Sequence, residues 1–210
     1  MTSIIIITIA FLIAIFFKFT KTENKRLYKI MWCSHLTFFG LTMTALILLL
    51  NSYSFAGYLT DKLFVIFFFA TGILLFGLYR HKRKIVRAYF ACFFLSPILL
   101  LLGLIIPPLH FITVVAGLGL LMDGEHERYA IDKTYSIQTS RVGFLSSGPT
   151  FSLVENKYLL FEKTTSDIIF GAGTPKSFKI EKVGPDSVRL DILSSELVDE
   201  RLDTIILLKR

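Results

Sequence analysis

Long apolar runs alternate with short basic segments through the first 122 residues of the chain. Three runs carry almost no charge and cover residues 3–17, 30–50 and 63–79. A fourth apolar region, 88–122, is longer and contains the dipeptide Pro107-Pro108. A helix needs about 20 apolar residues to cross the hydrocarbon of a bilayer. The pattern therefore predicts a bundle of about four transmembrane helices in a domain that covers residues 1–122.

The fourth apolar region has two interpretations. As one helix it would be roughly 52 Å long, too long for one ordinary crossing, and prolines break or kink helices. In the first interpretation, one crossing is followed by a short interfacial or re-entrant piece, and the C-terminal domain lies outside. In the second, two short helices form a hairpin at Pro107-Pro108 and the domain is cytoplasmic. We favour the first, because the 14-residue second arm is short for a crossing.

Residues 123–210 change to an alternation of apolar and polar positions with period two, which is typical of strands. Strands are expected at 129–139, 151–155, 158–164, 177–183, 188–193 and 204–209. Turns are expected at 155–157 and 184–186, and a short helix at 195–202. This domain is predicted to be a small antiparallel barrel or sandwich of five or six strands.

Composition supports the same division of the chain. The sequence is 53% hydrophobic, with a mean hydropathy of +0.63. Residues 1–122 hold 11 Lys+Arg against 2 Asp+Glu, whereas residues 123–210 hold 12 against 14. The basic excess falls in two short segments between apolar runs, so we attribute the net charge of +7 to membrane orientation and expect no nucleic-acid partner.

The two basic segments predict the topology. They contain Lys18, Lys21, Lys25, Arg26 and Lys29 after the first run, and Arg80, Lys82, Arg83, Lys84 and Arg87 after the third. Positive loops stay in the cytoplasm. We therefore expect a multi-pass protein of the plasma (inner) membrane with its N-terminus outside, an uncleaved first helix, and a C-terminal domain outside the cytoplasm.

Small residues recur at helical spacing on two of the predicted helices. The stripes consist of Cys33, Thr37, Gly40 and Thr44 on the second helix, and Ala88, Cys92, Ser96 and Gly103 on the fourth. Small residues let helix backbones approach closely in lipid. These stripes are predicted to be helix-packing surfaces, and the alternative is a groove for a partner helix or a lipid.

No pattern in the chain predicts a catalytic, cofactor or metal site. His35 is expected at the cytoplasmic start of the second helix, and His110 just past the prolines. Under the favoured topology they lie in opposite leaflets, which disfavours a shared haem iron. The acidic group Asp123, Glu125, His126 and Glu127 is interpreted as a solvated linker, since no second cluster completes a metal shell. The segments 146–149 and 171–174 are interpreted as turns.

The sequence therefore favours a non-enzymatic protein with no cofactor. We expect an accessory or scaffold subunit of a membrane complex, whose partners are the lipid bilayer and other membrane or envelope proteins. A small transporter or channel for a lipid or an uncharged solute is the first alternative. An envelope sensor is the second.

Overall fold

The computed structural model divides the chain into two compact units. One unit is formed by Met1–Ile47 and Leu59–Asp123, and the other by Leu48–Tyr58 and Gly124–Arg210. The residues that the structure describes are 2–21, 24–57, 59–79, 83–111, 113–114, 117, 127–140, 150–157, 160–169, 175–184, 187–194 and 201–207.

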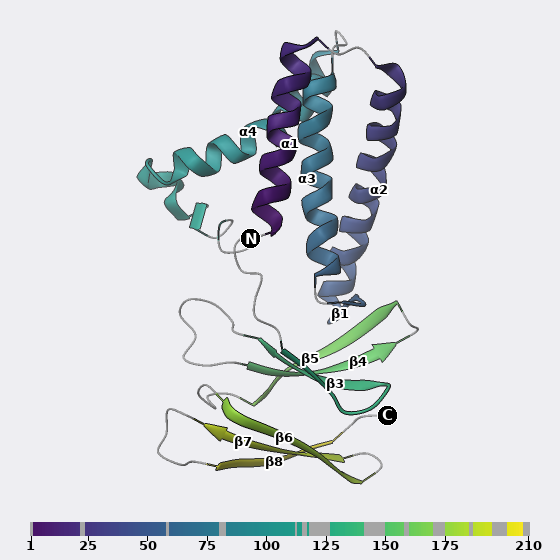
Figure 1. Cartoon of the computed structure of the whole chain (residues 1–210), viewed down its shortest axis with the longest axis vertical. Helices are drawn as coiled ribbons and strands as arrows, with labels where there is room; N and C mark the ends of the chain where they lie inside the picture. The colour runs from purple at the N-terminus through teal and green to yellow at the C-terminus, as the bar shows by residue number, and fades with distance from the viewer. Residues whose placement is uncertain are drawn as a thin grey trace. The chain divides into compact units, whose positions relative to one another are not determined.

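Four long helices account for most of the described residues of the first unit, and Figure 1 shows their arrangement. They are α1 (Thr2–Phe19), α2 (Lys25–Leu50), α3 (Thr60–Leu78) and α4 (Lys84–Gly103). All four are long and apolar enough to cross a membrane. The predicted helices are thereby confirmed, although α2 and α4 begin earlier than expected, within the basic segments. The Asn24 side chain caps α2, because its Oδ1 accepts hydrogen bonds from the backbone N–H groups of Arg26 (3.1 Å) and Leu27 (3.0 Å).

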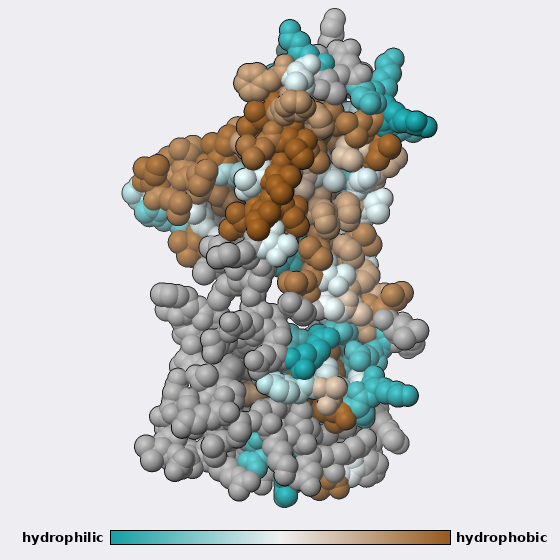
Figure 2. Space-filling model, in the orientation of Figure 1, coloured by the Kyte–Doolittle hydropathy of each residue, from teal (hydrophilic) through white to brown (hydrophobic). Residues whose placement is uncertain are grey.

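The helices pack through two apolar clusters. Ala10 and Ala14 of α1 lie against Ala70 and Ile73 of α3. Nearer the basic helix ends, Leu75 and Tyr79 pack against Phe90 of α4. The outer sides of the helices are strongly apolar, as the brown surface in Figure 2 shows.

Helix α4 contains Pro97, which removes one backbone donor. The carbonyl of Phe93, four residues earlier, instead accepts a hydrogen bond from the Ser96 hydroxyl at 2.8 Å. Such a replacement satisfies a backbone group that lipid would leave unpaired. A proline inside this helix is therefore accommodated without an orphaned carbonyl.

The chain doubles back after α4. The helix ends at Gly103, and a short 3₁₀ helix, Pro107–Leu109, follows. The Thr113 hydroxyl then lies 3.4 Å from the carbonyl oxygen of Leu100, and a Cβ at Gly103 would collide with Thr113. A reversal is compatible with the hairpin and with a re-entrant piece after one crossing. Residues 118–122 lie outside the described residues, so the number of crossings stays a prediction.

Two antiparallel sheets make up the second unit. The first has the order β1-β5-β4-β3-β2 and the second the order β6-β7-β8. Their strands are β1 (Tyr53–Phe55), β2 (Glu127–Ala130), β3 (Tyr135–Ser140), β4 (Thr150–Lys157), β5 (Phe161–Ile169), β6 (Pro175–Gly184), β7 (Ser187–Ser194) and β8 (Arg201–Leu207). The five-stranded sheet has two open edges, so the barrel alternative is wrong.

Several local predictions in this unit need correction. The expected strand 129–139 is two strands, because the Asp132 carboxylate accepts hydrogen bonds from the N–H groups of Thr134 and Tyr135 and forms a turn (both 2.8 Å). The turn predicted at 155–157 is wrong, since these residues pair within β4. The hairpin between β6 and β7 is confirmed by the pairing of Gly184 with Ser187. The helix predicted at 195–202 is wrong at Arg201 and Leu202, which belong to β8.

Candidate functional site

The segment between α2 and α3 forms a strand of the C-terminal sheet. Its strand β1 pairs antiparallel with β5, so that Tyr53 faces Lys163 and Phe55 faces Phe161. Two further backbone hydrogen bonds extend this ladder, from Thr164 N–H to the Ser52 carbonyl (3.0 Å) and from Ala56 N–H to the Leu160 carbonyl (2.8 Å). The sheet is therefore joined to the helices by this segment as well as by the chain that precedes β2.

A buried carboxylate on β5 holds this segment in place. Glu162 is 5% exposed. One of its oxygens, Oε1, accepts a hydrogen bond from the backbone N–H of Gly57 at 3.2 Å. Gly57 has a φ of 97°, a conformation that favours glycine. The carboxylate thus fixes the turn that follows β1.

Glu162 also forms a two-pronged ion pair with Arg128 of β2. Arg128 Nη1 lies 2.8 Å from Oε1 and Nη2 lies 2.9 Å from Oε2. Nη2 also donates to Gln138 Oε1 of β3 at 2.8 Å. In the sheet, β3 and β4 lie between β2 and β5, so the pair reaches across the sheet face. Bidentate pairs of this kind combine strength with geometric specificity. We call Arg128, Glu162 and Gly57 the clasp.

A second polar cluster lies inside the helical unit. His35 of α2 is 1% exposed. Its Nδ1 lies 3.0 Å from Thr71 Oγ1 on α3, and its Nε2 lies 2.9 Å from the Tyr89 hydroxyl on α4. Its ring stacks on Phe68 at 4.7 Å and meets Phe93 edge-on at 5.3 Å. The imidazole therefore joins three helices.

The hydrogen bonds favour one tautomer of this imidazole. The Thr71 hydroxyl lies 2.8 and 3.0 Å from the carbonyl oxygens of Phe67 and Phe68, which share its single hydrogen. When Thr71 donates in this way, its oxygen accepts from Nδ1–H and Nε2 accepts from the Tyr89 O–H. A neutral imidazole satisfies every donor and acceptor of the cluster. Its physical role is that of an interhelical connection.

His35 was expected near a helix end, and this expectation is wrong. Helix α2 begins at Lys25, so ten residues place His35 about 15 Å inside the helix. His110 is also engaged, since its Nε2 lies 2.8 Å from the Leu104 carbonyl oxygen. In the described part of the chain, no group of three or more His, Cys, Asp and Glu side chains is arranged to hold a metal. Of the acidic linker, Asp123, Glu125 and His126 lie outside the described residues, as do 146–149 and 171–174.

The small-residue stripe of α2 lies on its outer side. Cys33, Thr37, Gly40 and Thr44 are all exposed, whereas α2 turns His35, Thr42 and Ala45 inward. A Cβ on Gly40 would meet nothing within 4 Å. The role of this stripe in helix packing stays a prediction.

The stripe predicted on α4 is divided. Ala88 and Cys92 are exposed, Ser96 is half-buried, and Gly103 is buried. Gly103 makes a close approach to Thr113, because a Cβ at this glycine would collide with the Thr113 side chain. The two cysteines are separate exposed thiols.

A close contact between α1 and α3 involves residues outside the two predicted stripes. A Cβ on Gly77 of α3 would lie 2.5 Å from the carbonyl oxygen of Ala14 on α1. Ala10 and Ala14 form a small-x-x-x-small pair, which is the signal that predicts such an approach.

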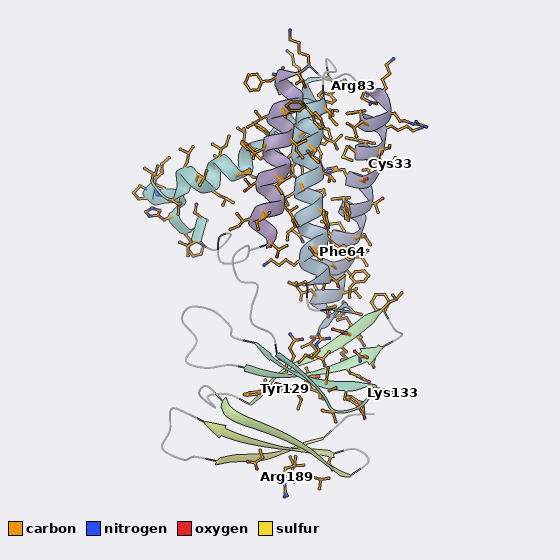
Figure 3. All side chains as sticks on the ribbon, in the orientation of Figure 1. Cys33, Phe64, Arg83, Tyr129, Lys133 and Arg189 are labelled. Atoms are coloured by element: carbon orange, nitrogen blue, oxygen red, sulfur yellow. The ribbon has the colours of Figure 1, made fainter. Side chains whose placement is uncertain are left out.

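The basic residues gather at helix ends. Lys18 lies in the last turn of α1, where its Nζ is 4.8 Å from the centre of the Phe76 ring. The side chains of Lys21, Lys25, Arg26, Lys29, Arg83, Lys84 and Arg87 are exposed. Arg80 and Lys82 lie outside the described residues. The first basic segment joins the end of α1 to the start of α2, and the second joins the end of α3 to the start of α4. Arg83, in the second segment, is labelled in Figure 3.

Comparisons with known proteins give no relative. No protein family model, no curated protein and no solved structure matches this chain.

Proposed function

We propose that this chain is a non-catalytic membrane scaffold that presents its C-terminal sheets outside the cytoplasm to other membrane or envelope proteins. The observation that carries the proposal is the pairing of β1 with β5. Insertion, orientation and partner binding each have their own support.

Insertion is supported by the outer surface of the helices. Leu12, Phe16 and Ile47 are 60–62% exposed, and Figure 2 shows brown, hydrophobic residues over much of the helical unit. Soluble monomers rarely carry continuous apolar surface on this scale. Helices of 18–26 residues are about 27–39 Å long and match the hydrocarbon thickness of a bilayer.

Orientation follows from the chain path. The basic segments connect α1 to α2 and α3 to α4, so the positive-inside rule assigns those connections to the cytoplasm. The segment between α2 and α3 then lies on the opposite side. Because β1 belongs to that segment and is hydrogen-bonded into the sheet, the sheet must share its side. This reasoning favours a single net crossing by residues 88–122.

The scaffold role is supported by how the sheet is attached. Three chain connections join the helices to the sheet: the two ends of β1 and the segment before β2. A partner bound to the sheet would therefore be tethered to the helices through three chain segments. Val183 on β6 and Ile205 on β8 are 52% and 54% exposed. These two strands are edge strands, which present unpaired backbone groups to a partner.

Affinity purification tests the proposal. The full chain with a C-terminal tag is extracted from native membranes in mild detergent, and co-purifying proteins are identified by mass spectrometry. We expect a stoichiometric partner to co-purify with the wild-type chain and to be lost from the Ile205→Asp variant. It should be retained by Leu160→Asp, a matched control that changes a residue 65% exposed in the turn before β5. Isolation of the wild-type chain alone would contradict the scaffold role.

An envelope sensor is the second candidate, and one observation favours it. Strand β1 lies directly between α2 and α3, so a ligand that displaced β5 would pull on two helices. A sensor would purify without a constant partner. Its β1–β5 pairing would then change with the external stimulus.

A further inference from the structure

Helix α2 carries an open groove on its outer side. The groove has a volume of about 450 Å³ and is lined by Lys29, Ile30, Cys33, Ser34, Thr37 and Phe38. Three of these residues, Cys33, Ser34 and Thr37, have small side chains, and we call them the floor of the groove. Cys33 is labelled on α2 in Figure 3. The volume falls within the range of about 300–1,000 Å³ that is usual for small-molecule sites.

The length of the groove matches one leaflet of a bilayer. Lys29 and Phe38 are nine residues apart, which is about 14 Å along a helix axis. Half of a hydrocarbon core of about 30 Å is close to the same length. A partner helix would lie along much more of α2, which is 26 residues long. The groove is therefore sized for an acyl chain rather than for a helix.

The mouth of the groove is cationic. Lys29 lines it, and Lys25 and Arg26 lie one turn earlier; all three side chains are exposed. The first turn of α2 contains no acidic residue. Cations at a helix N-terminus oppose the helix dipole, so they do not stabilise the helix itself. Their charge is complementary to an anion at the membrane surface.

Aromatic side chains lie at the same level of the helix bundle as the cationic mouth of the groove. The Tyr28 ring lies 6.4 Å from that of Trp32 and 6.3 Å from that of Tyr79. Tryptophan and tyrosine are enriched where membrane meets water. The cationic mouth is therefore at the depth of lipid headgroups, and the floor of the groove extends from there into the hydrocarbon.

We propose that this groove binds an anionic phospholipid. Its phosphate contacts Lys29, and one acyl chain lies over Cys33, Ser34 and Thr37 as far as Phe38. The charge at the mouth selects the headgroup, and the small residues make room for the chain. This site is independent of the scaffold role, which concerns the sheets.

Native mass spectrometry of the full chain in detergent tests the site, with phosphatidylglycerol and phosphatidylcholine titrated separately. The wild type should bind phosphatidylglycerol at least about fivefold more tightly, the effect expected of one cation near an anionic surface. Lys29→Gln should remove this preference, whereas Lys84→Gln, an exposed cation at the start of α4, should retain it. Thr37→Phe should weaken binding of both lipids, whereas Thr44→Phe, on the same face beyond the groove, should not.

Three results would overturn the proposal. Equal losses from Lys29→Gln and Lys84→Gln would show general charge attraction without a site. Unchanged lipid binding by Thr37→Phe would mean that no chain lies in the groove. A dimer of the wild type that Thr37→Phe dissociates, with lipid binding unaltered, would assign the groove to a helix of a second copy. Circular dichroism and elution volume identify any variant that is not folded, and Cys33→Leu then replaces Thr37→Phe.

Discussion

Glu162 is the residue on which the clasp depends. Its carboxylate accepts hydrogen bonds from Gly57 in the segment that contains β1 and from Arg128 on β2. Removing one partner of a buried ion pair leaves the other charge without compensation. Arg128 retains 30% exposure of its side chain, so water moderates this cost.

Glu162→Gln should loosen β1. The neutral amide keeps the shape but points an N–H group at the guanidinium, and we expect a loss of about 2 kcal/mol, the range found for hydrogen bonds to charged groups. Hydrogen exchange measured by mass spectrometry should then accelerate roughly thirtyfold at residues 52–57, since 1.4 kcal/mol is tenfold. Glu155→Gln is the control, because Glu155 pairs at 3.5 Å with Lys157 on its own strand. Equal acceleration in both variants would contradict the clasp.

Within the helical unit, His35 is the buried polar residue that connects several elements. Its ring fills space between α2, α3 and α4, and both nitrogens are hydrogen-bonded. His35→Ala should therefore lower the free energy of unfolding by about 3 kcal/mol, mostly through the cavity left behind. Leu36→Ala, at a site 51% exposed, should cost far less. Titration with SDS, followed by the fluorescence of the single tryptophan, Trp32, measures both. Similar midpoints for the two variants would show that the cluster is not a core contact.

At the scale of elements, glycines distinguish the packed helix faces from the outer ones. A Cβ at Gly77 would collide with the backbone of Ala14, whereas one at Gly40 would meet nothing. Gly77→Ala should therefore separate α1 from α3 and cost about 1–3 kcal/mol. Gly40→Ala should be neutral or stabilising, because alanine favours helix by about 1 kcal/mol over glycine. The same SDS titration compares them. A loss of stability in Gly40→Ala as large as in Gly77→Ala would contradict this assignment of faces.

The helices were predictable because their signal is local. Each apolar run is long enough to identify a helix by itself, and the hairpin at 184–186 has strong turn formers. The packed helix faces were less predictable. Cys33 and Ala14 both belong to small-residue patterns, and only the positions of the neighbouring helices decide which of these patterns forms a helix–helix contact.

The membership of β1 in the sheet was not predictable. The segment 53–55 is three residues long, too short for an alternation, and it pairs with residues more than 100 positions away. The burial of Glu162 is equally nonlocal, because Arg128 and Gly57 come from separate segments. His35 was misplaced for a simpler reason, since the basic residues before it belong to the helix rather than to a loop.

At the scale of the whole molecule, one segment, β1, connects the helices to the sheet and relates the side of the sheet to the topology of the helices. The basic helix ends set an expected orientation, and β1 then assigns the sheet to the side of the segment between α2 and α3. Presentation of the sheets to envelope partners requires that side to be outside. The proposed scaffold therefore requires that β1 pairs with β5 and that this pair lies outside the cytoplasm.

A disulfide across β1 and β5 tests both parts of this claim. The hydrogen bonds of this ladder join Ser52 to Thr164 and Ala56 to Leu160, so Tyr53 and Lys163 form a non-hydrogen-bonded pair. The Cα atoms of such pairs are about 4.5 Å apart, which a disulfide can span. The measurement is the electrophoretic detection of the bridge in Tyr53→Cys/Lys163→Cys, made in the Cys33→Ser/Cys92→Ser background, with Tyr53→Cys/Lys157→Cys as the control.

The bridge should form in intact cells without added oxidant, because an extracytoplasmic compartment is oxidising. The control pair should stay reduced, since Lys157 lies on β4, beyond β5 from β1. If the two thiols stay free in cells and form the disulfide only after isolated membranes are oxidised, the sheet lies on the cytoplasmic side. Thiols that stay free under oxidant would contradict the β1–β5 pairing and the proposed scaffold together.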